Sequence, residues 1–189
     1  MVLENVVLTD ALECCWHCRN AKLRGVQAEH GDYLFMHGEN IDVDGFRLNG
    51  NYSFQYCRNV VIRNAEIHSK DAFWNTEDVT VYDSVVDGEY LGWHSRNLRL
   101  VNCRISGTQA LCYAENLVLE NCTLGEDADL CFEYSSVHAE IKGRVHSVKN
   151  PRSGRIVAEE YGDIILDEHC KAPANCSIET GKAQSGEAA

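Results

Sequence analysis

The sequence predicts an all-β fold, a single-stranded parallel β-helix in which each coil takes about 19 residues. Six segments repeat one pattern around an anchor residue, and from the second anchor onward the interval is 19 residues, with a first interval one residue longer. A fixed period of this kind marks an internal repeat, which sets the architecture. Apolar residues alternate after each anchor, as they do in a strand with one buried face. The anchors are Asn20, Asn40, Asn59, Asp78, Asn97 and Asn116.

The chain opens with an abbreviated copy of the pattern at Asn5–Leu8, which ends well before the next anchor. No capping segment precedes this copy, although solenoids normally need a cap to shield the end of the stack. We therefore expect either that N-terminal coils are lacking or that the first coil abuts a partner. The partner would then be a second copy of the chain, which predicts a homo-oligomer formed through the open N-terminal coil.

Each regular coil is expected to contain three short strands separated by turns. The first strand follows the anchor, as in Ile41 and Val43, and a turn rich in Gly, Asn and Asp ends it. A second short alternating strand follows, as in Phe46 and Leu48, and leads to a polar corner. The third strand carries one large apolar residue per coil in register, with Gly92 as the exception: Phe35, Phe54, Phe73, Leu111 and Leu130. Strands of neighbouring coils should pair in parallel, about 4.8 Å apart.

The regular spacing ends after Phe132, although short alternating runs continue. We expect one β-helix unit over 1–170, with regular coils over about 17–132 and irregular closing coils over 133–170. The composition of 171–189 is small and polar, which predicts a disordered tail.

Two other repeat folds fit the sequence less well. Leu98–Ile105 and Leu117–Leu124 partly match the leucine-rich consensus, but the leading Leu is absent and no helical pattern fills the rest of the coil. A left-handed helix of hexapeptide repeats would show a six-residue period, which this sequence lacks.

The composition excludes several classes of partner. The formal charge is -12, from 29 acidic and 17 basic residues, which argues against nucleic acid or an anionic membrane held by bulk electrostatics. The N-terminus does not resemble a signal peptide, so we expect a cytoplasmic protein whose ten cysteines are reduced. The run Cys14–Cys18 contains a Cys-x-x-Cys motif with a histidine, but it aligns with the coil corner at Trp93–Asn97. We therefore predict neither a metal nor a cofactor.

Two columns of residues, the anchors and the residues just before them, are interpreted as structural ladders. Stacked amides of the anchors can hydrogen-bond from coil to coil and suit turn conformations. The residue before each anchor alternates in charge along the stack, as in Arg58, Glu77 and Arg96. This pattern favours ion pairs between neighbouring coils that fix the register of the stack at an exposed corner.

The candidate binding surface lies just before these ladders. One column holds Trp74 and Trp93, and the next holds Tyr56, His94 and Tyr113. If this segment is a strand with the Phe column buried, alternation exposes Trp74 and Trp93. Such a surface is either a stack of rings that stabilises the fold or a platform for a saccharide. At a polar corner, His68, Asp87 and Glu89 lie on neighbouring coils and are the candidate acid and base groups, if they are more than solvated polar residues.

The span from about His30 to Thr123, including NYSFQYCRNVVIRNAEI and GEYLGWHSRNLRLVNC, resembles an uncharacterised bacterial family known only as a domain of unknown function. The segment VKNPRSG near Lys149 extends the similarity. The resemblance implies a right-handed β-helix of the pectin-lyase-like class and additional N-terminal coils. It implies no established activity and offers no catalytic residues.

Two functions of different kinds follow. The first is a β-helix that binds or modifies carbohydrate through its aromatic flank, in line with the many polysaccharide-active members of the wider class. The second is a non-catalytic solenoid that self-associates. Whether the chain is an enzyme stays open at this point, because fold does not imply function.

Overall fold

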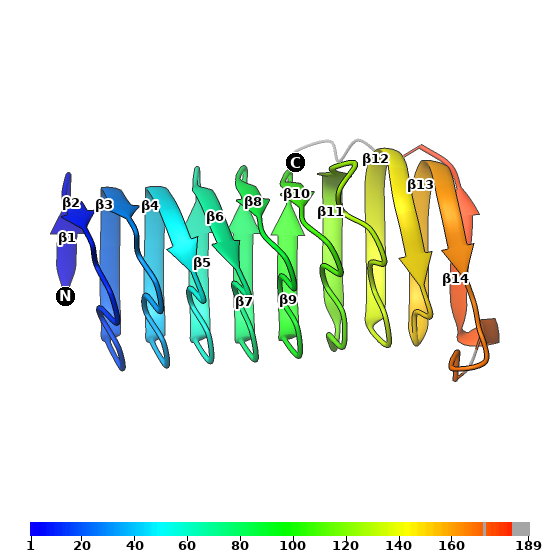
Figure 1. The fold of residues 1–189 in the computed structure, drawn as a ribbon, viewed down its shortest axis with the longest axis horizontal. Coiled ribbons are helices and arrows are strands. Elements are labelled where there is room, and N and C mark those ends of the chain that lie inside the picture. Colours follow the sequence, from blue (N-terminus) through cyan, green and yellow to red (C-terminus); the bar gives the residue numbers. More distant parts are fainter. Residues whose placement is uncertain (172, 183–189) are drawn as a thin grey trace, which may run out of the picture.

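The structure is a computed structural model that describes residues 1–171 and 173–182. It is an all-β solenoid of about nine turns spaced about 19 residues apart, which confirms the predicted parallel β-helix. The turns follow one another along the long axis from the N-terminal end to β14 (Figure 1). The strands are β1 (Val2–Glu4), β2 (Val7–Thr9), β3 (Arg19–Glu29), β4 (Glu39–Asn51), β5 (Arg58–Arg63), β6 (Glu66–Lys70), β7 (Glu77–Tyr82), β8 (Val85–Asp87), β9 (Arg96–Val101), β10 (Arg104–Ser106), β11 (Leu117–Leu124), β12 (Ser136–Lys149), β13 (Ser153–Ile165) and β14 (Cys176–Thr180), with a short 3-10 helix, η1, at Pro173–Asn175.

The strands pair in the register that the repeat predicts. Ile41 of β4 pairs with Val60 of β5, Val60 with Val79 of β7, and Val79 with Leu98 of β9, always in parallel. All four side chains are buried, so each lies over its equivalent in the next coil. The second strands form a matching ladder through β6, β8 and β10.

The bend between the two strands of a coil is made by residues in the left-handed backbone region. Asn64, Asp83 and Asn102 have φ values of 53°, 49° and 55°, and the anchor residues have similar values. Asn and Asp tolerate this region better than most residues because their short polar side chains hydrogen-bond locally. The requirement explains why the repeat keeps Asn, Asp or Gly at both positions.

The predicted third strand is wrong, because this side of each coil is a run of turns. Alternate residues have positive φ, as at Tyr52, Phe54 and Tyr56, with values of 60°, 55° and 56°. The coils remain hydrogen-bonded to one another there: the Phe54 amide donates to the Leu34 carbonyl at 2.8 Å. Because the backbone is not extended, side chains do not alternate between inside and outside, and Leu34 and Phe35 are both buried.

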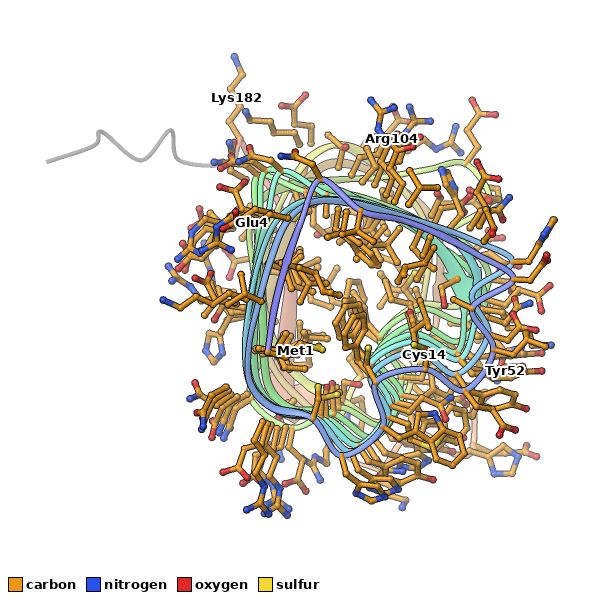
Figure 2. All side chains as sticks on the ribbon, turned by 90° about the vertical axis from the view of Figure 1, so that its left-hand side faces the viewer. Met1, Glu4, Cys14, Tyr52, Arg104 and Lys182 are labelled. Carbon is orange, nitrogen blue, oxygen red and sulfur yellow. The ribbon has the colours of Figure 1, made fainter. Side chains whose placement is uncertain are left out.

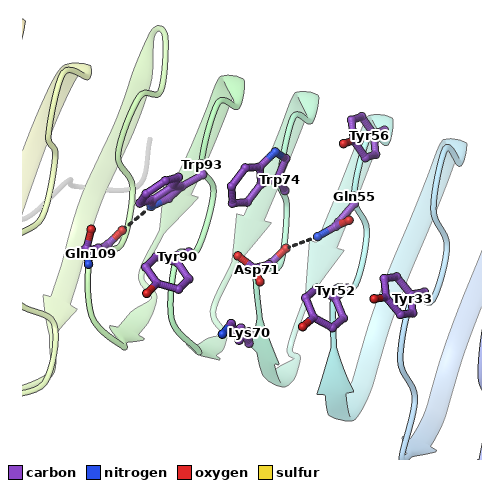
Figure 3. Close-up of a pocket in the computed structure, with 10 residues that line it drawn as sticks. All are labelled: Tyr33, Tyr52, Gln55, Tyr56, Lys70, Asp71, Trp74, Tyr90, Trp93 and Gln109. Carbon is purple, nitrogen blue, oxygen red and sulfur yellow. Dashed lines mark hydrogen bonds between the residues drawn. The ribbon is translucent and has the colours of Figure 1, made fainter.

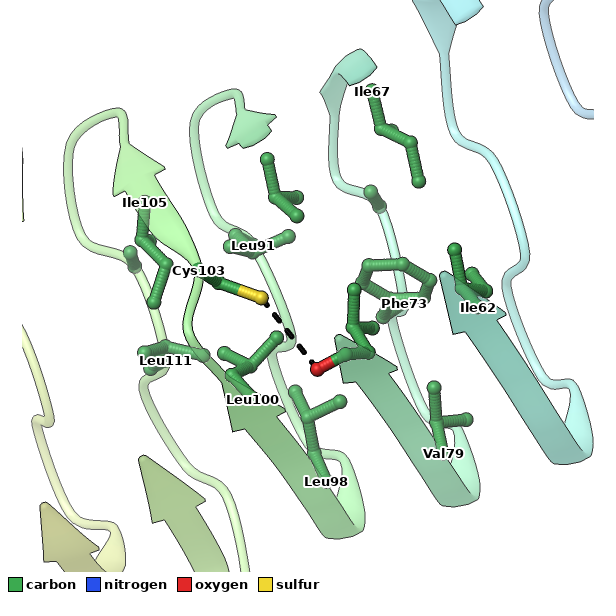
Figure 4. Packing of buried hydrophobic residues seen from close by; sticks show 14 of the residues in the cluster. Ile62, Ile67, Phe73, Val79, Leu91, Leu98, Leu100, Cys103, Ile105 and Leu111 are labelled. Carbon is green, nitrogen blue, oxygen red and sulfur yellow. Dashed lines mark hydrogen bonds between the residues drawn. The ribbon is translucent and has the colours of Figure 1, made fainter. Parts of the chain in front are cut away.

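The core is a continuous stack along the axis. Phe35 and Phe54 stack with ring centroids 5.0 Å apart, and Phe54 and Phe73 follow at 5.7 Å. Figure 4 shows side chains of the third side, such as Leu91 and Leu111, meeting those of the strands in this core. Phe132, and not the predicted Leu130, continues the column, since its amide bonds to the Ala110 carbonyl and its ring is fully buried. The chain is longer by two residues at this turn.

The anchor ladder forms as predicted, with one interruption. Side-chain amides join Asn40 to Asn20 and Asn59 to Asn40 at 3.1 and 2.6 Å, and join Asn97 to Asp78 at 2.8 Å. Within the described residues no side-chain bond joins Asn59 to Asp78, because two acceptors face each other once the Asn59 amide has donated to Asn40.

A second amide ladder runs along the bend between the strands and is interrupted at the same level. Asn64 donates to Asp44 at 2.8 Å and Asn102 donates to Asp83 at 2.9 Å. In the part of the chain that the structure describes, no side-chain bond joins Asn64 to Asp83. Both ladders therefore lack a rung between the same two coils.

The charged column pairs as predicted at every step but one, because no ion pair joins Glu39 to Arg58 within the described residues. Glu77 accepts ion pairs from Arg58 at 3.3 Å and from Arg96 at 3.4 Å, and Arg96 reaches Glu115 at 3.5 Å. These side chains are largely exposed, so each pair contributes only about 0.2–1 kcal/mol.

The two ends differ from the middle of the stack. At the N-terminal end β1 and β2 pair on one side with β3, and Met1, Val2, Val7 and Leu12 are exposed. At the other end β14 pairs with β13, so Cys176–Thr180 are ordered where a disordered tail was predicted for 171–189. The rest of that predicted tail, at 172 and 183–189, lies outside the described residues. No described helix is long and apolar enough to span a membrane.

Candidate functional site

The third side of the solenoid carries three neighbouring columns of side chains on its outer surface, seen end-on in Figure 2. The tyrosine column contains Tyr33, Tyr52, Asp71, Tyr90 and Gln109. The tryptophan column contains Trp16, Met36, Gln55, Trp74 and Trp93. The outer ring column contains His17, His37, Tyr56, Asn75, His94, Tyr113 and Tyr134.

Most rings within a column stack on one another where consecutive coils carry them; Tyr113 and Tyr134, tilted by 51°, do not. Tyr33 and Tyr52 lie 4.6 Å apart with planes at 13°, and Trp74 and Trp93 lie 5.3 Å apart at 29°. Contacts of this kind stabilise a pair by about 0.5–1.5 kcal/mol beyond area burial. The predicted stabilising ring stack is therefore present.

The tyrosine column is interrupted at Asp71, and a groove of about 680 Å³ opens at this point. Figure 3 shows the Asp71 side chain between Tyr52 and Tyr90, where the neighbouring coils would lead one to expect a ring. Trp74 and Trp93 line the other side of the groove.

Asp71 is the most unusual group in this groove. The residue is only 8% exposed. Within residues 1–171 and 173–182, no side chain or backbone amide donates a hydrogen bond to its carboxylate. Burial raises the pKa of the Asp71 carboxyl above its ordinary value of 3.8; the Lys70 ammonium opposes the rise and the Glu89 carboxylate adds to it. A carboxylate in such surroundings can accept hydrogen bonds from a ligand without losing any protein partner.

The backbone around Asp71 fixes its position. Asp71 has a φ of 54°, and its carbonyl accepts a hydrogen bond from the Gln55 side chain at 3.1 Å. The ammonium of its neighbour Lys70 pairs with Glu89 instead, at 3.4 Å, and lies 5.3 Å from the centre of the Tyr90 ring.

The two tryptophans are held differently. The Trp93 indole donates to the Gln109 carbonyl at 2.6 Å, which fixes the ring along the groove wall. The Trp74 indole N–H has no acceptor among the described residues, so it is available to a bound molecule.

The five residues predicted to bind a saccharide do not all line this groove. Trp74, Trp93 and Tyr56 line it, whereas His94 lines an adjoining hollow and Tyr113 stacks behind His94 at 4.9 Å. Both the tryptophan column and the outer ring column reach the surface. The expectation that only one of them would do so assumed a strand on this side.

The predicted corner cluster separates into two parts. His68 contacts Asp87 at 3.0 Å and Glu66 at 3.1 Å, and the hydrogen bonds that its ring donates, first to Glu66 and then to Asp87, raise the pKa of His68. Glu89 instead pairs with Lys70 beside the groove. Since both ring nitrogens of His68 are engaged, this histidine bridges two carboxylates of the coil corner.

Sequence reasoning missed Asp71, Tyr52 and Tyr90. The signal was present in the repeat, because the column reads Tyr33, Tyr52, Asp71, Tyr90 and one coil replaces a ring by a carboxylate. A departure from a structural column is better evidence of function than the column itself.

The cysteines act as core side chains. All ten are free, and Cys57, Cys103, Cys112, Cys122 and Cys131 are buried. Burial raises the pKa of Cys57 and Cys112 to about 12, so these thiols stay protonated. Among the described residues, no group of three or more His, Cys, Asp and Glu side chains is arranged to hold a metal ion.

Comparison with known proteins places the chain in a family. Residues 1–179 match the model of DUF3737, described as a protein of unknown function, and the chain belongs to that family. No curated protein and no solved structure matches it.

Proposed function

We propose that this member of the DUF3737 family binds a saccharide in the groove over Asp71, with one pyranose ring lying between Tyr52 and Tyr90. The observation that carries the proposal is the Asp71 carboxylate, which belongs to a residue only 8% exposed and receives no hydrogen bond from the described residues. It lies in an aromatic groove of about 680 Å³.

Sugar hydroxyls are the donors that such a carboxylate needs. A pyranose ring also presents a flat face of C–H groups, which packs against aromatic rings by burying apolar surface. Tyr52, Tyr90 and the two tryptophans would supply that contact, and the Lys70 and Gln109 side chains add polar groups at the rim.

The groove extends over several coils and suits a short oligosaccharide better than a single sugar. Successive coils are about 4.8 Å apart, which is close to the length of one sugar unit in a chain. The pectin-lyase-like class that the sequence resemblance implies is rich in polysaccharide-active proteins, and this supports the same class of ligand by analogy only.

We propose that the protein binds the saccharide without hydrolysing it. Asp71 supplies the carboxylate of the groove lining, whereas hydrolysis of a glycosidic bond usually requires two carboxyl groups on opposite sides of it. A bound saccharide that is recovered unchanged is the expected result.

The test is a glycan array followed by calorimetry with the best ligand, on the native protein and on Asp71→Asn and Trp93→Ala. Both variants should weaken binding at least about tenfold, the effect of losing one good contact. The matched control is Asp87→Asn, a carboxylate of the neighbouring corner outside the groove, which should bind as the native protein does. Absence of any glycan ligand, or equal affinity in Asp71→Asn, would refute the proposal.

A second function is favoured by the N-terminal coil. Met1, Val2, Val7 and Leu12 are exposed there, and among the described strands β1 and β2 pair with β3 alone. Exposed apolar edge strands pair with other chains unless charge prevents it. Self-association through this coil predicts a concentration-dependent dimer in light scattering that a Val2→Lys, Val7→Lys variant abolishes; a native protein that stays monomeric at all concentrations would exclude it.

A further inference from the structure

The outer ring column contains a second interruption, in the same coil as Asp71. Two pairs of consecutive rings in this column lie nearly parallel, His37 and Tyr56 at 4.8 Å and His94 and Tyr113 at 4.9 Å, whereas Tyr113 and Tyr134 are tilted by 51°. Asn75 lies between these two pairs and carries no ring. The Tyr56 and His94 rings therefore face each other across one missing member, about 9.6 Å apart if each coil adds ~4.8 Å.

The gap over Asn75 is a hollow of about 480 Å³ lined by Tyr56, Asn75 and His94. It is separate from the groove over Asp71, although Tyr56 borders both. Trp74, which lines the groove and not the hollow, lies beside the His94 ring, with centroids 5.5 Å apart and planes at 54°.

The polar groups of the hollow are neutral in sum. Arg58 and Arg96, which both pair with Glu77, are balanced in the lining by the two carboxylates of Glu39 and Glu77. The Asn75 side-chain amide makes no hydrogen bond within the described part of the chain, and it offers a donor and an acceptor side by side.

We propose that this hollow binds a planar nitrogen heterocycle, with adenine as the type, which inserts between Tyr56 and His94 and completes the ring column. The observed spacing of one ring per coil leaves room for one flat ring with a stacking partner on each face. The Asn75 amide meets the edge of the heterocycle, because an amide pairs through two hydrogen bonds with the adjacent acceptor and amino group of adenine. Because the surroundings are neutral in sum, the hollow should bind the uncharged base of a nucleoside and not a phosphate group.

The proposal rests on the outer ring column and does not depend on the saccharide proposal. The two differ in ligand and in residues, so each can fail alone. Asp71→Asn should leave heterocycle binding unchanged, and His94→Ala should leave saccharide binding unchanged.

The test is a titration with adenosine, followed by saturation-transfer NMR and by tryptophan fluorescence, with ribose as the control ligand. Asn75→Tyr supplies the missing ring and should abolish binding, while His94→Ala removes one wall and should weaken it at least about tenfold, as expected for one base–aromatic stack. The matched control is Tyr134→Ala, which removes a ring of the same column two coils beyond His94 and should bind as the native protein does.

The outcomes are decisive in either direction. Saturation transfer to the adenine protons but not to ribose alone, lost in Asn75→Tyr, supports the proposal. No transfer at millimolar adenosine, or equal binding by the native protein and Asn75→Tyr, overturns it. If Asn75→Tyr fails to fold, the contrast between His94→Ala and Tyr134→Ala gives the same decision.

Discussion

Replacing Asp71 by Asn should make the protein more stable at neutral pH, because the native carboxylate is a buried charge without a donor. Asn keeps the shape of the side chain and stays neutral, so the variant avoids the additional cost of burying a charge. The groove is open to water on one side, which limits this cost, and we expect a gain of about 1 kcal/mol. For a chain of this size, that difference raises the melting temperature by about 2–4 °C.

The stabilisation should depend on pH in a defined direction. The pKa of Asp71 is raised in the folded protein, first by burial, so the folded state binds the proton more readily than the unfolded state does. Stability then falls as the pH rises from 3.8 through the higher folded pKa. The gap between Asp71→Asn and the native protein is therefore full at neutral pH and disappears in acid.

Urea denaturation across a pH series measures this gap, and Asp87→Asn is the matched control of opposite sign. Burial would raise the pKa of Asp87, but hydrogen bonds from His68 and Ser106 outweigh it and lower that pKa. Asp87 therefore stabilises the fold at neutral pH and loses this effect as the pH falls through its folded pKa. An Asp71→Asn variant that is less stable than the native protein, or a gap that does not change with pH, would contradict the account of Asp71.

Three further substitutions test the packing and the ladders, each by urea denaturation. Phe54→Ala removes a fully buried ring that stacks on Phe35 and Phe73 and should cost about 3–5 kcal/mol; a loss below 1 kcal/mol would show that the ring stack is not the core. Asp78→Asn supplies a donor toward Asn59 and should stabilise the fold by about 0.5–1 kcal/mol, whereas no change would mean that water already satisfies both acceptors. Asn75→Tyr should stabilise the fold by up to about 1 kcal/mol, because the new ring adds stacking contacts with Tyr56 and His94. The backbone accepts a tyrosine here, since Tyr56 has a φ of 56° at the equivalent position. A variant less stable than Asn75→Ala would refute this.

Much of the fold could be predicted from the sequence because the strands obey simple rules. The 19-residue spacing and the alternation at Ile41, Val60 and Val79 define register and burial together. The third side could not be predicted in the same way. Its backbone alternates into the left-handed region at aromatic residues such as Phe54 and Tyr56, which propensity rules assign to strands.

The candidate site was only partly predictable for the same reason. Trp74 and Trp93 are visible as a column, but which columns reach the surface depends on the backbone of the third side. Asp71 has no neighbouring motif in the sequence. Its importance comes from its burial between Tyr52 and Tyr90, which becomes clear only when the coils are stacked.

The shared interruption of the two amide ladders has a consequence for cooperativity. In a solenoid each coil interacts with its neighbours, so the weakest interface between coils sets where the stack divides into separate folding units. The junction before β7 has fewer side-chain bonds than the junctions on either side. Within the described residues, no side-chain bond joins Asn59 to Asp78 or Asn64 to Asp83 across it. We expect amide hydrogen exchange to show two blocks of protection that meet at this junction, with slower exchange across the boundary when a ligand bridges Tyr52 and Tyr90.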